Sequence, residues 1–481
     1  MRRHEVTDSG IVKQHYWPIP DKMPCYNSRP NHIVTSTMKT PELLSPAGTL
    51  HNMRYALAYG ADAVYAGQPR YSLRARNNDF DLEHLGIGID EAHAQGKRFY
   101  VASNISPHNR KVDTYLTDMA PVIALGPDAL IMADPGLMML VRERWPEMPI
   151  HLSVQANTVN YATVQFWQSL NVERVILSRE LSLDEIDDIR QRCPDMELEV
   201  FVHGALCIAY SGRCLLSGYF NRRDPNQGTC TNACRWDYSV TPAAEDATGD
   251  LLAIDLAEIT AAPSACGDMP RHPLADQPVL IEEGGRPGEQ MVMEEDEHGT
   301  YILNSKDLRA LEHVARLCEI GVDCLKIEGR TKSHYYAART AQVYRQAIDD
   351  AVAGRELEPR LLGALEGLAN RGYTDGFYQR HHVAEHQNYL RGHSVSNEQQ
   401  FCGEIVAVAG GQAEILAKNK FRIGDNVEVI RPEGNRKMRI EAMTDLRGQA
   451  VNEAPGGGHR VLIPWPGEMP KLGLLARYLR D

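Results

Sequence analysis

Eight short apolar runs, separated by longer stretches with helical periodicity, constrain the fold of this chain more than any other feature of its sequence. The stretches 50–59 and 183–192, for example, place apolar residues at helical spacing between runs rich in β-branched residues, which is the pattern of parallel βα units. Such units in succession predict an α/β fold, a (β/α)8 TIM-like barrel, with a doubly wound open sheet as the alternative. The predicted strands cover residues 42–47, 61–67, 98–104, 129–134, 150–156, 174–180, 198–204 and 325–330.

A long insertion separates the seventh predicted strand from the eighth, because about 120 residues lie between them. It begins with a cluster of cysteines, continues through the acidic segment 242–298 and ends in a helix predicted over 308–318. Residues 335–354 predict a long helix, and from Phe401 onward short alternating runs with glycine turns predict a small β-barrel. We expect a flexible N-terminal extension (1–38), a TIM-like catalytic domain (39–398) with its cysteine-rich insertion at about 205–300, and a C-terminal β-barrel domain (399–481).

The net charge of −13 is concentrated in the insertion, where residues 242–298 carry fourteen acids and two arginines, a net −12. The other 424 residues therefore carry only −1. The last 81 residues hold twelve bases and ten acids, so part of the surface can still neutralise phosphates, as nucleic-acid binding requires. The alternative is that these bases lie on ordinary solvated strand faces.

The composition is that of an ordinary globular protein, with 43% hydrophobic and 24% charged residues. The most apolar run, 129–141, is interrupted by Asp134, Pro135 and Gly136, so no stretch approaches the ~20 apolar residues of a membrane-spanning helix. The N-terminus lacks the apolar core of a secretory signal. We therefore expect a cytoplasmic protein with reduced cysteines, in which clustered cysteines are candidate metal or cluster ligands.

Four of the ten cysteines fall within 28 residues of one another. Six residues separate the first pair, fifteen the middle pair and three the last pair. The C-x2-C knuckles typical of structural zinc sites are absent, so the spacing favours an iron–sulfur cluster, with zinc or unligated buried cysteines as alternatives. The remaining six are scattered singly, and we expect them to be buried. The four candidate ligands are Cys207, Cys214, Cys230 and Cys234.

Polar residues end most of the predicted strands, and the C-terminal ends of barrel strands are where TIM barrels place their chemistry. His203 ends the seventh strand and is a candidate acid or base. Helix capping or a loop hydrogen bond is the alternative for each of these residues. The catalytic candidates are Tyr65, Gln155, His203 and Glu328.

Long motifs carry a resemblance to a known family. The stretch 199–217, EVFVHGALCIAYSGRCLLS, resembles the signature of the collagenase-like peptidase family. Within it the chain is most similar to the members that hydroxylate tRNA uridine with prephenate, from about Pro41 to the C-terminus. Further matching motifs are ELLSPAG at 42–48, GADAVYAG at 60–67, HLSVQAN at 151–157, DPNQGTC at 224–230 and LKIEGR at 325–330.

The resemblance implies an enzyme that installs the 5-hydroxyl of the wobble uridine of tRNA. It further implies a 4Fe–4S cluster on the four clustered cysteines, prephenate as cosubstrate, and accessory proteins for cluster assembly. Prephenate carries two carboxylates, which arginines can clamp by bidentate hydrogen bonds. Pairing with local carboxylates such as Glu180 and Glu328 is the alternative for these arginines. The substrate-binding candidates are Asn104, Arg179, Arg213 and Arg330.

The resemblance also implies a surface that contacts tRNA, and the basic stretch of the C-terminal domain is our candidate for it. Its RNA-binding candidates are Arg431, Arg436, Lys437 and Arg439. A metal-dependent or cysteine peptidase is the alternative function, although no recognisable nucleophile and base stand in the sequence. A cluster-bearing assembly or sensor protein without catalysis is a third possibility.

Overall fold

The computed structural model of the chain describes residues 38–479 except for 69, 73–78, 106, 206–208, 211–212, 215–237, 246–250, 254–278, 284–289, 297–298, 304–306, 369, 371 and 380–398. The chain divides into two units after Thr37, and the described residues belong to the second. Among these residues there is no helix with the length and apolar character needed to cross a membrane.

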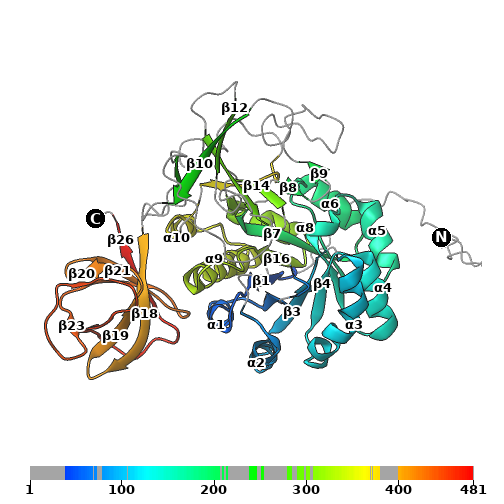
Figure 1. Cartoon of the computed structure of the whole chain (residues 1–481). Coiled ribbons are helices and arrows are strands. Elements are labelled where there is room, and N and C mark those ends of the chain that lie inside the picture. The colour runs from blue at the N-terminus through cyan, green and yellow to red at the C-terminus, as the bar shows by residue number, and fades with distance from the viewer. Residues whose placement is uncertain are drawn as a thin grey trace, which may run out of the picture. The chain divides into compact units, whose positions relative to one another are not determined.

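Eight parallel strands close into a barrel, which confirms the predicted (β/α)8 architecture (Figure 1). The strands from β1 to β7 pair in chain order, and β16 pairs with both β7 and β1 to close the ring. Their apolar residues are buried because a parallel barrel is filled inside and covered outside. The strands are β1 (Glu42–Pro46), β2 (Ala63–Gly67), β3 (Arg98–Ser103), β4 (Ala129–Met132), β5 (Ile150–Leu152), β6 (Arg174–Ile176), β7 (Glu197–Ala205) and β16 (Cys324–Ile327).

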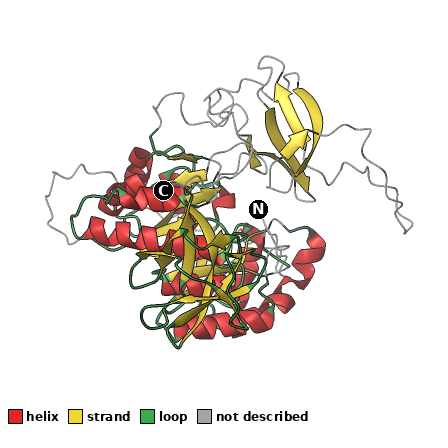
Figure 2. Cartoon of the chain, turned by 90° about the vertical axis from the view of Figure 1, so that its left-hand side faces the viewer, coloured by secondary structure: helices red, strands yellow, loops and turns green. Residues whose placement is uncertain are grey.

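Helices surround the barrel strands (Figure 2). Side-chain caps fix where several of them begin: Thr49 accepts from the backbone of Asn52, and Ser182 forms a capping box with Glu185. The long helix predicted after the eighth strand is confirmed as α9. The helices are α1 (Leu50–Ala58), α2 (Leu82–His93), α3 (Asn109–Ala124), α4 (Pro135–Arg144), α5 (Tyr161–Ser169), α6 (Leu183–Arg192), α8 (Val314–Ile320), α9 (His334–Val352) and α10 (Arg360–Glu366).

The insertion contains more regular structure than the sequence predicts. A five-stranded antiparallel sheet in the order β11-β10-β12-β13-β14 lies within it. The helix predicted over 308–318 begins later, because β15 (Asp307–Arg309) instead pairs with the end of β7 and is followed by a 3-10 turn and α8. The strands of the insertion are β8 (Ala209–Tyr210), β9 (Arg213–Cys214), β10 (Tyr238–Glu245), β11 (Leu251–Ala253), β12 (Val279–Glu283), β13 (Gln290–Asp296) and β14 (Gly299–Leu303).

The C-terminal residues form the predicted small β-domain, an antiparallel sheet in the order β22-β21-β26-β18-β19-β25-β23 with a separate β20–β24 pair. Its own core includes Ile415, Phe421 and Trp465. The strands are β18 (Gln399–Ala409), β19 (Gln412–Ala417), β20 (Phe421–Arg422), β21 (Asn426–Ile430), β22 (Arg436–Arg439), β23 (Thr444–Asp445), β24 (Glu453–Ala454), β25 (Arg460–Pro464) and β26 (Leu474–Tyr478).

Buried polar contacts join the C-terminal sheet to the barrel helices. Arg339 on α9 is 3% exposed and its Nη2 lies 2.7 Å from Oε2 of Glu428 on β21. The hydroxyl of Tyr59, next to α1, donates to the carbonyls of Ile430 and Leu472, each at 2.9 Å. Ile430 also packs in the core of the barrel. The two domains thus share both apolar and polar contacts.

Candidate functional site at the barrel mouth

Two of the predicted site residues approach the carboxylate of a third, Glu328, at the C-terminal end of the barrel. Glu328 follows β16, and its Oε2 lies 3.5 Å from the hydroxyl of Tyr65 on β2 and 3.5 Å from Nη2 of Arg179, which follows β6. The Tyr65 hydroxyl also donates to the carbonyl of Ile327 at 3.1 Å. A phenol, a carboxylate and a guanidinium in this arrangement can exchange a proton and hold an anion.

Cations and aromatic rings lie directly beneath this group. The Arg179 guanidinium stacks 3.8 Å from the ring centre of Phe201 on β7. Lys326 Nζ lies 4.3 Å from the ring centre of Tyr65 and is held by Glu199 Oε1 at 2.7 Å. Lys326 was not among the predicted site residues, although it stands between Cys324 and Glu328 at the period of two that makes alternate strand residues face the same side.

Arg330 lies beside the same group. It is 7% exposed, its Nη1 donates to Ser72 Oγ at 2.6 Å, and its guanidinium is 5.8 Å from the Tyr65 ring centre. The last residue of β2 must be glycine for this contact, since a Cβ on Gly67 would lie 2.4 Å from Ser72 Oγ and 2.5 Å from Arg330 Nη1. The GADAVYAG motif therefore ends in the residue that lets Arg330 reach the mouth.

Two further predicted residues meet on the other side of the mouth. Asn104 Nδ2 donates to Gln155 Oε1 at 2.7 Å, and Ser153 Oγ donates to the same oxygen at 2.6 Å. Gln155 lies in the 3-10 turn Val154–Ala156 between β5 and α5, and Asn157 closes the turn with φ 53°. The amide pair is thus fixed by a turn that asparagine is suited to close.

His203 faces away from the mouth. It is 1% exposed and packs against three tyrosine rings outside the barrel, at 5.5 to 5.7 Å between ring centres. Burial lowers its pKa to about 3, so the imidazole is neutral at physiological pH. Its Nδ1 lies 3.3 Å from the hydroxyl of Tyr344 on α9. These surroundings suit a packing role, and the acid or base role of His203 stays a prediction.

The predicted cluster ligands fall almost wholly outside the described residues. Cys207, Cys230 and Cys234 lie outside them, and of Cys214 and Arg213 the structure describes only the backbone, in β9. The β8–β9 pair follows β7 along the chain and sets Cys214 opposite Ala209, two residues after Cys207 in the sequence. Four thiols from one segment after a barrel strand are a donor set that fits an iron–sulfur cluster.

The cysteines whose side chains are described are buried. Burial raises the pKa of the Cys318 thiol to about 11 and that of the Cys402 thiol to about 12. Cys193 and Cys324 are buried as well, and the pKa of each thiol is raised by burial. A cysteine peptidase needs a thiol with a lowered pKa, which none of these four provides. The prediction that the single cysteines are buried is confirmed for them.

The predicted RNA-binding residues lie on and beside β22, an edge strand of the C-terminal sheet. Lys437 and Arg439 are exposed, whereas Arg436 is half-buried, with its guanidinium 4.5 Å from the ring centre of Trp465. Arg431 Nε donates to the carbonyl of Gly434 at 2.8 Å. Lys437 Nζ also lies 4.8 Å from the ring centre of Tyr478, so three of the four bases take part in local contacts.

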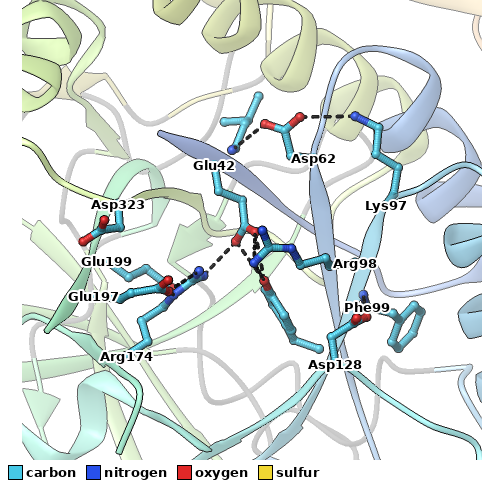
Figure 3. A network of polar contacts seen from close by, with 12 residues as sticks. Glu42, Asp62, Lys97, Arg98, Phe99, Asp128, Arg174, Glu197, Glu199 and Asp323 are labelled. Carbon is cyan, nitrogen blue, oxygen red and sulfur yellow. Dashed lines mark hydrogen bonds and ion pairs between the residues drawn. The ribbon is translucent and has the colours of Figure 1, made fainter. Parts of the chain in front are cut away.

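A second polar network fills the opposite, N-terminal end of the barrel (Figure 3). Arg174 is 2% exposed and contacts Glu42 at 2.7 Å, Glu197 at 2.7 Å and Glu199 at 3.3 Å. Arg98, at the start of β3, also reaches Glu42, at 3.2 Å. Sequence reasoning missed this network because these residues begin their strands, and only the closed barrel brings them together. Charged residues at this end are expected to serve stability rather than catalysis.

Known proteins share both domains of this chain. It matches the model of peptidase family U32 over residues 48–388 and that of the peptidase family U32 C-terminal domain over residues 397–477. It is 60% identical over 439 residues to the tRNA hydroxylation protein P of Escherichia coli (strain K12), covering 90% of this chain and 95% of that protein. The protein of the same name from Haemophilus influenzae (strain ATCC 51907 / DSM 11121 / KW20 / Rd) is 58% identical over 434 residues, 90% of this chain and 94% of that protein.

A more distant relative carries a name that refers to a different RNA. The 23S rRNA 5-hydroxycytidine C2501 synthase of Escherichia coli (strain K12) is 27% identical over 443 residues, which cover 89% of this chain and 57% of that protein. The family models span the barrel and the C-terminal sheet, and the two nearest of these three relatives align over nearly their whole length. The resemblance read from the motifs is therefore confirmed, and the chain belongs to peptidase family U32.

Proposed function

We propose that this chain hydroxylates tRNA, installing the 5-hydroxyl of the wobble uridine with prephenate as cosubstrate and an iron–sulfur cluster as cofactor. The observation that carries the proposal is its 60% identity to the tRNA hydroxylation protein P of Escherichia coli, over 95% of that protein. The rRNA relative is named for a 5-hydroxylated pyrimidine. The wobble base lies in a single-stranded loop, so it can enter a pocket without breaking a duplex.

The charges at the barrel mouth support a dicarboxylate cosubstrate. Arg179 and Arg330 approach the mouth from two strand ends, and Lys326 adds a third cation below them. Because Arg179 already pairs with Glu328, an incoming carboxylate would compete for the same guanidinium. We assign Glu328 and Tyr65 as the pair that accepts and returns a proton, and Asn104 with Gln155 as hydrogen-bonding groups for the substrate.

The four clustered cysteines are the residues that would hold the cluster. When bound, an iron–sulfur cluster supplies electron transfer or Lewis-acid chemistry. Arg213, which lies beside Cys214 in β9, is our candidate for binding an anion next to it. The sequence between β7 and β10 thus contributes the cofactor ligands, and the strand ends contribute the binding groups.

Nucleoside mass spectrometry tests the proposal. Total tRNA is compared between a deletion strain and the same strain complemented with wild type, Cys207→Ala, Arg179→Gln or Arg144→Gln, grown without oxygen to suppress any parallel aerobic route. Arg144 is the matched control, because it also lies over an aromatic ring, at 5.8 Å from that of Trp145, but at the far end of α4.

We expect 5-hydroxyuridine and its derivatives to vanish in the deletion and Cys207→Ala strains. Arg179→Gln should lower them at least about tenfold, the loss expected for one charge-assisted hydrogen bond, and Arg144→Gln should restore them fully. An unchanged nucleoside profile in the deletion strain would refute the hydroxylase proposal. Turnover of a protein substrate that survives removal of iron would favour a peptidase instead.

A further inference from the structure

Three metal-ligating side chains from separate elements meet outside the barrel mouth. They are His51 on α1, His334 at the start of α9 and Glu404 on β18, and one ligand atom from each lies within 4.8 Å of the others. Among the residues that the structure describes, this is the one such group of three. Neither the proposed reaction nor the predicted RNA contacts use any of them.

Each histidine nitrogen lies close to one oxygen of the Glu404 carboxylate. His51 Nε2 lies 3.1 Å from Glu404 Oε2, and His334 Nε2 lies 3.4 Å from Glu404 Oε1. Ligands that are 2.0–2.1 Å from a tetrahedral zinc ion stand about 3.3 Å from one another. Two histidine nitrogens and one glutamate oxygen are also a donor set that zinc takes, with water in the fourth position. An ion could therefore enter with little rearrangement of these side chains.

His334 supplies an independent observation. It is 8% exposed, and its Nε2 makes no hydrogen bond within the described part of the chain, which is costly for a buried polar atom. The ring is fixed between those of Tyr55 and Phe401, at 4.9 and 5.4 Å between centres. The two ring contacts hold the His334 imidazole beside the Glu404 carboxylate.

The remaining surroundings allow an ion to enter. Lys418 Nζ lies 3.1 Å from Glu404 Oε1 and is the cation that now balances this carboxylate. Its side chain is 39% exposed and flexible, so it can turn into solvent when a divalent ion takes its place. The His51 side chain is 47% exposed, which leaves the cluster open to water on that side.

We propose that His51, His334 and Glu404 bind a divalent transition-metal ion of the zinc class, which clamps the C-terminal sheet to the barrel. The ligands come from two barrel helices and from the first strand of the sheet, so the bound ion crosslinks the two domains. Water completes the coordination on the open side of His51. The role is structural, because the strand-end groups described above contribute no ligand.

Equilibrium dialysis of the full chain against Zn²⁺ tests the site. The clustered thiols can also bind zinc, but they do so equally in all variants. The test therefore compares the number of zinc equivalents bound by wild type with the number bound by each variant. Wild type is expected to bind one equivalent more than His51→Ala, a change at an exposed residue that leaves the core intact. His93→Ala is the matched control, since His93 is also exposed on a barrel helix and contacts a carboxylate, Asp128, at 2.9 Å; it should bind as wild type does.

A second variant separates a metal site from an ordinary ion pair. Lys418→Met removes the competing ammonium, so a metal site should bind Zn²⁺ about tenfold more tightly, as expected when about 1.4 kcal/mol of competition is lost. If His51→Ala binds as many equivalents as wild type, or if Lys418→Met leaves the affinity unchanged or weaker, the proposal is overturned.

Discussion

Arg174 illustrates a charge that only the closed barrel can explain. It is the first residue of β6 and, from the sequence, reads as a solvated strand end, yet it is 2% exposed and faces three carboxylates. A buried ion of this kind is tolerated only while its partners remain. Two of the matching motifs, ELLSPAG and EVFVHGALCIAYSGRCLLS, begin with Glu42 and Glu199 and so belong to a barrel whose N-terminal end is held by charge as well as by apolar packing.

Replacing Arg174 by methionine should destabilise the protein by about 3–5 kcal/mol, because Glu42 and Glu199 would lose the cation buried between them and keep only Arg98 and Lys326. Urea denaturation measures the loss. Arg98→Met is the matched control, since Arg98 contacts the same Glu42 but is 56% exposed, and it should cost less than about 1 kcal/mol. Equal losses in the two variants would contradict the assignment of Arg174 as the buried centre of the network.

His203 shows where strand periodicity misleads. Glu199, Phe201 and His203 alternate as one face of a strand, which predicts that His203 points into the barrel. The pairing of β7 with β16 shifts by one residue between Phe201 and His203, and such a bulge redirects the side chains that follow it. His203 consequently packs on α9, and no local sequence signal marks the bulge.

The pKa of His203, about 3 in the folded chain, lies below its unfolded value of about 6.5. Between these values the unfolded chain binds more protons at this residue, so its contribution to stability is lost as pH falls from 6.5 towards 3. His203→Gln should lower the slope of unfolding free energy against pH by up to about 1.4 kcal/mol per unit in this window. Urea denaturation from pH 7 to pH 5 tests this, with exposed His93→Gln as control; identical slopes for His203→Gln and wild type would refute it.

The elements that are predicted best from the sequence are the strands that are buried on both faces. All eight barrel strands are confirmed within a few residues, because a strand covered on both faces is a continuous apolar run. The sheet of the insertion was missed, since β12 and β13 carry part of the acidic excess and follow no clear alternation. The candidate residues at the barrel mouth could be predicted from their positions at strand ends. The place of Lys326 and the meeting of His51, His334 and Glu404 depend on pairings between distant elements, which the sequence alone does not reveal.

The exposed bases of β22 allow a test of the predicted RNA surface. Lys437 is exposed, and its Nζ lies 4.8 Å from the ring centre of Tyr478. Arg436 donates to the Pro466 carbonyl at 3.1 Å and packs on Trp465, so reversing Lys437 alone disturbs the fold less than reversing Arg436. If Lys437 contacts a phosphate, Lys437→Glu should weaken tRNA binding and reduce its salt slope by about one. Binding measured at several salt concentrations tests this against Arg144→Glu. If Lys437→Glu leaves the salt dependence of tRNA binding unchanged, the assignment of β22 to the RNA surface is wrong.

At the scale of the whole molecule, the barrel and the C-terminal sheet share a buried junction. Ile430, Leu474 and Ala476 of the sheet belong to the core of the barrel. Arg339, Gln399 and Glu428 form a buried polar group at the same junction, with Gln399 Nε2 donating to Glu428 Oε2 at 2.9 Å. His334 of the proposed metal clamp and Arg339 of this group both belong to α9, so one helix makes both contacts with the sheet.

Arg339→Met should therefore destabilise the protein by about 3–5 kcal/mol, since Glu428 would remain buried without its cation. The double variant Arg339→Met, Glu428→Leu should regain most of that loss, because an apolar pair can replace a buried ion pair at little cost. Urea denaturation of the two variants and of Glu428→Leu completes a double-mutant cycle. A double variant no more stable than Arg339→Met would show that the loss comes from packing of the long side chain, and the junction would then be held by apolar contact alone.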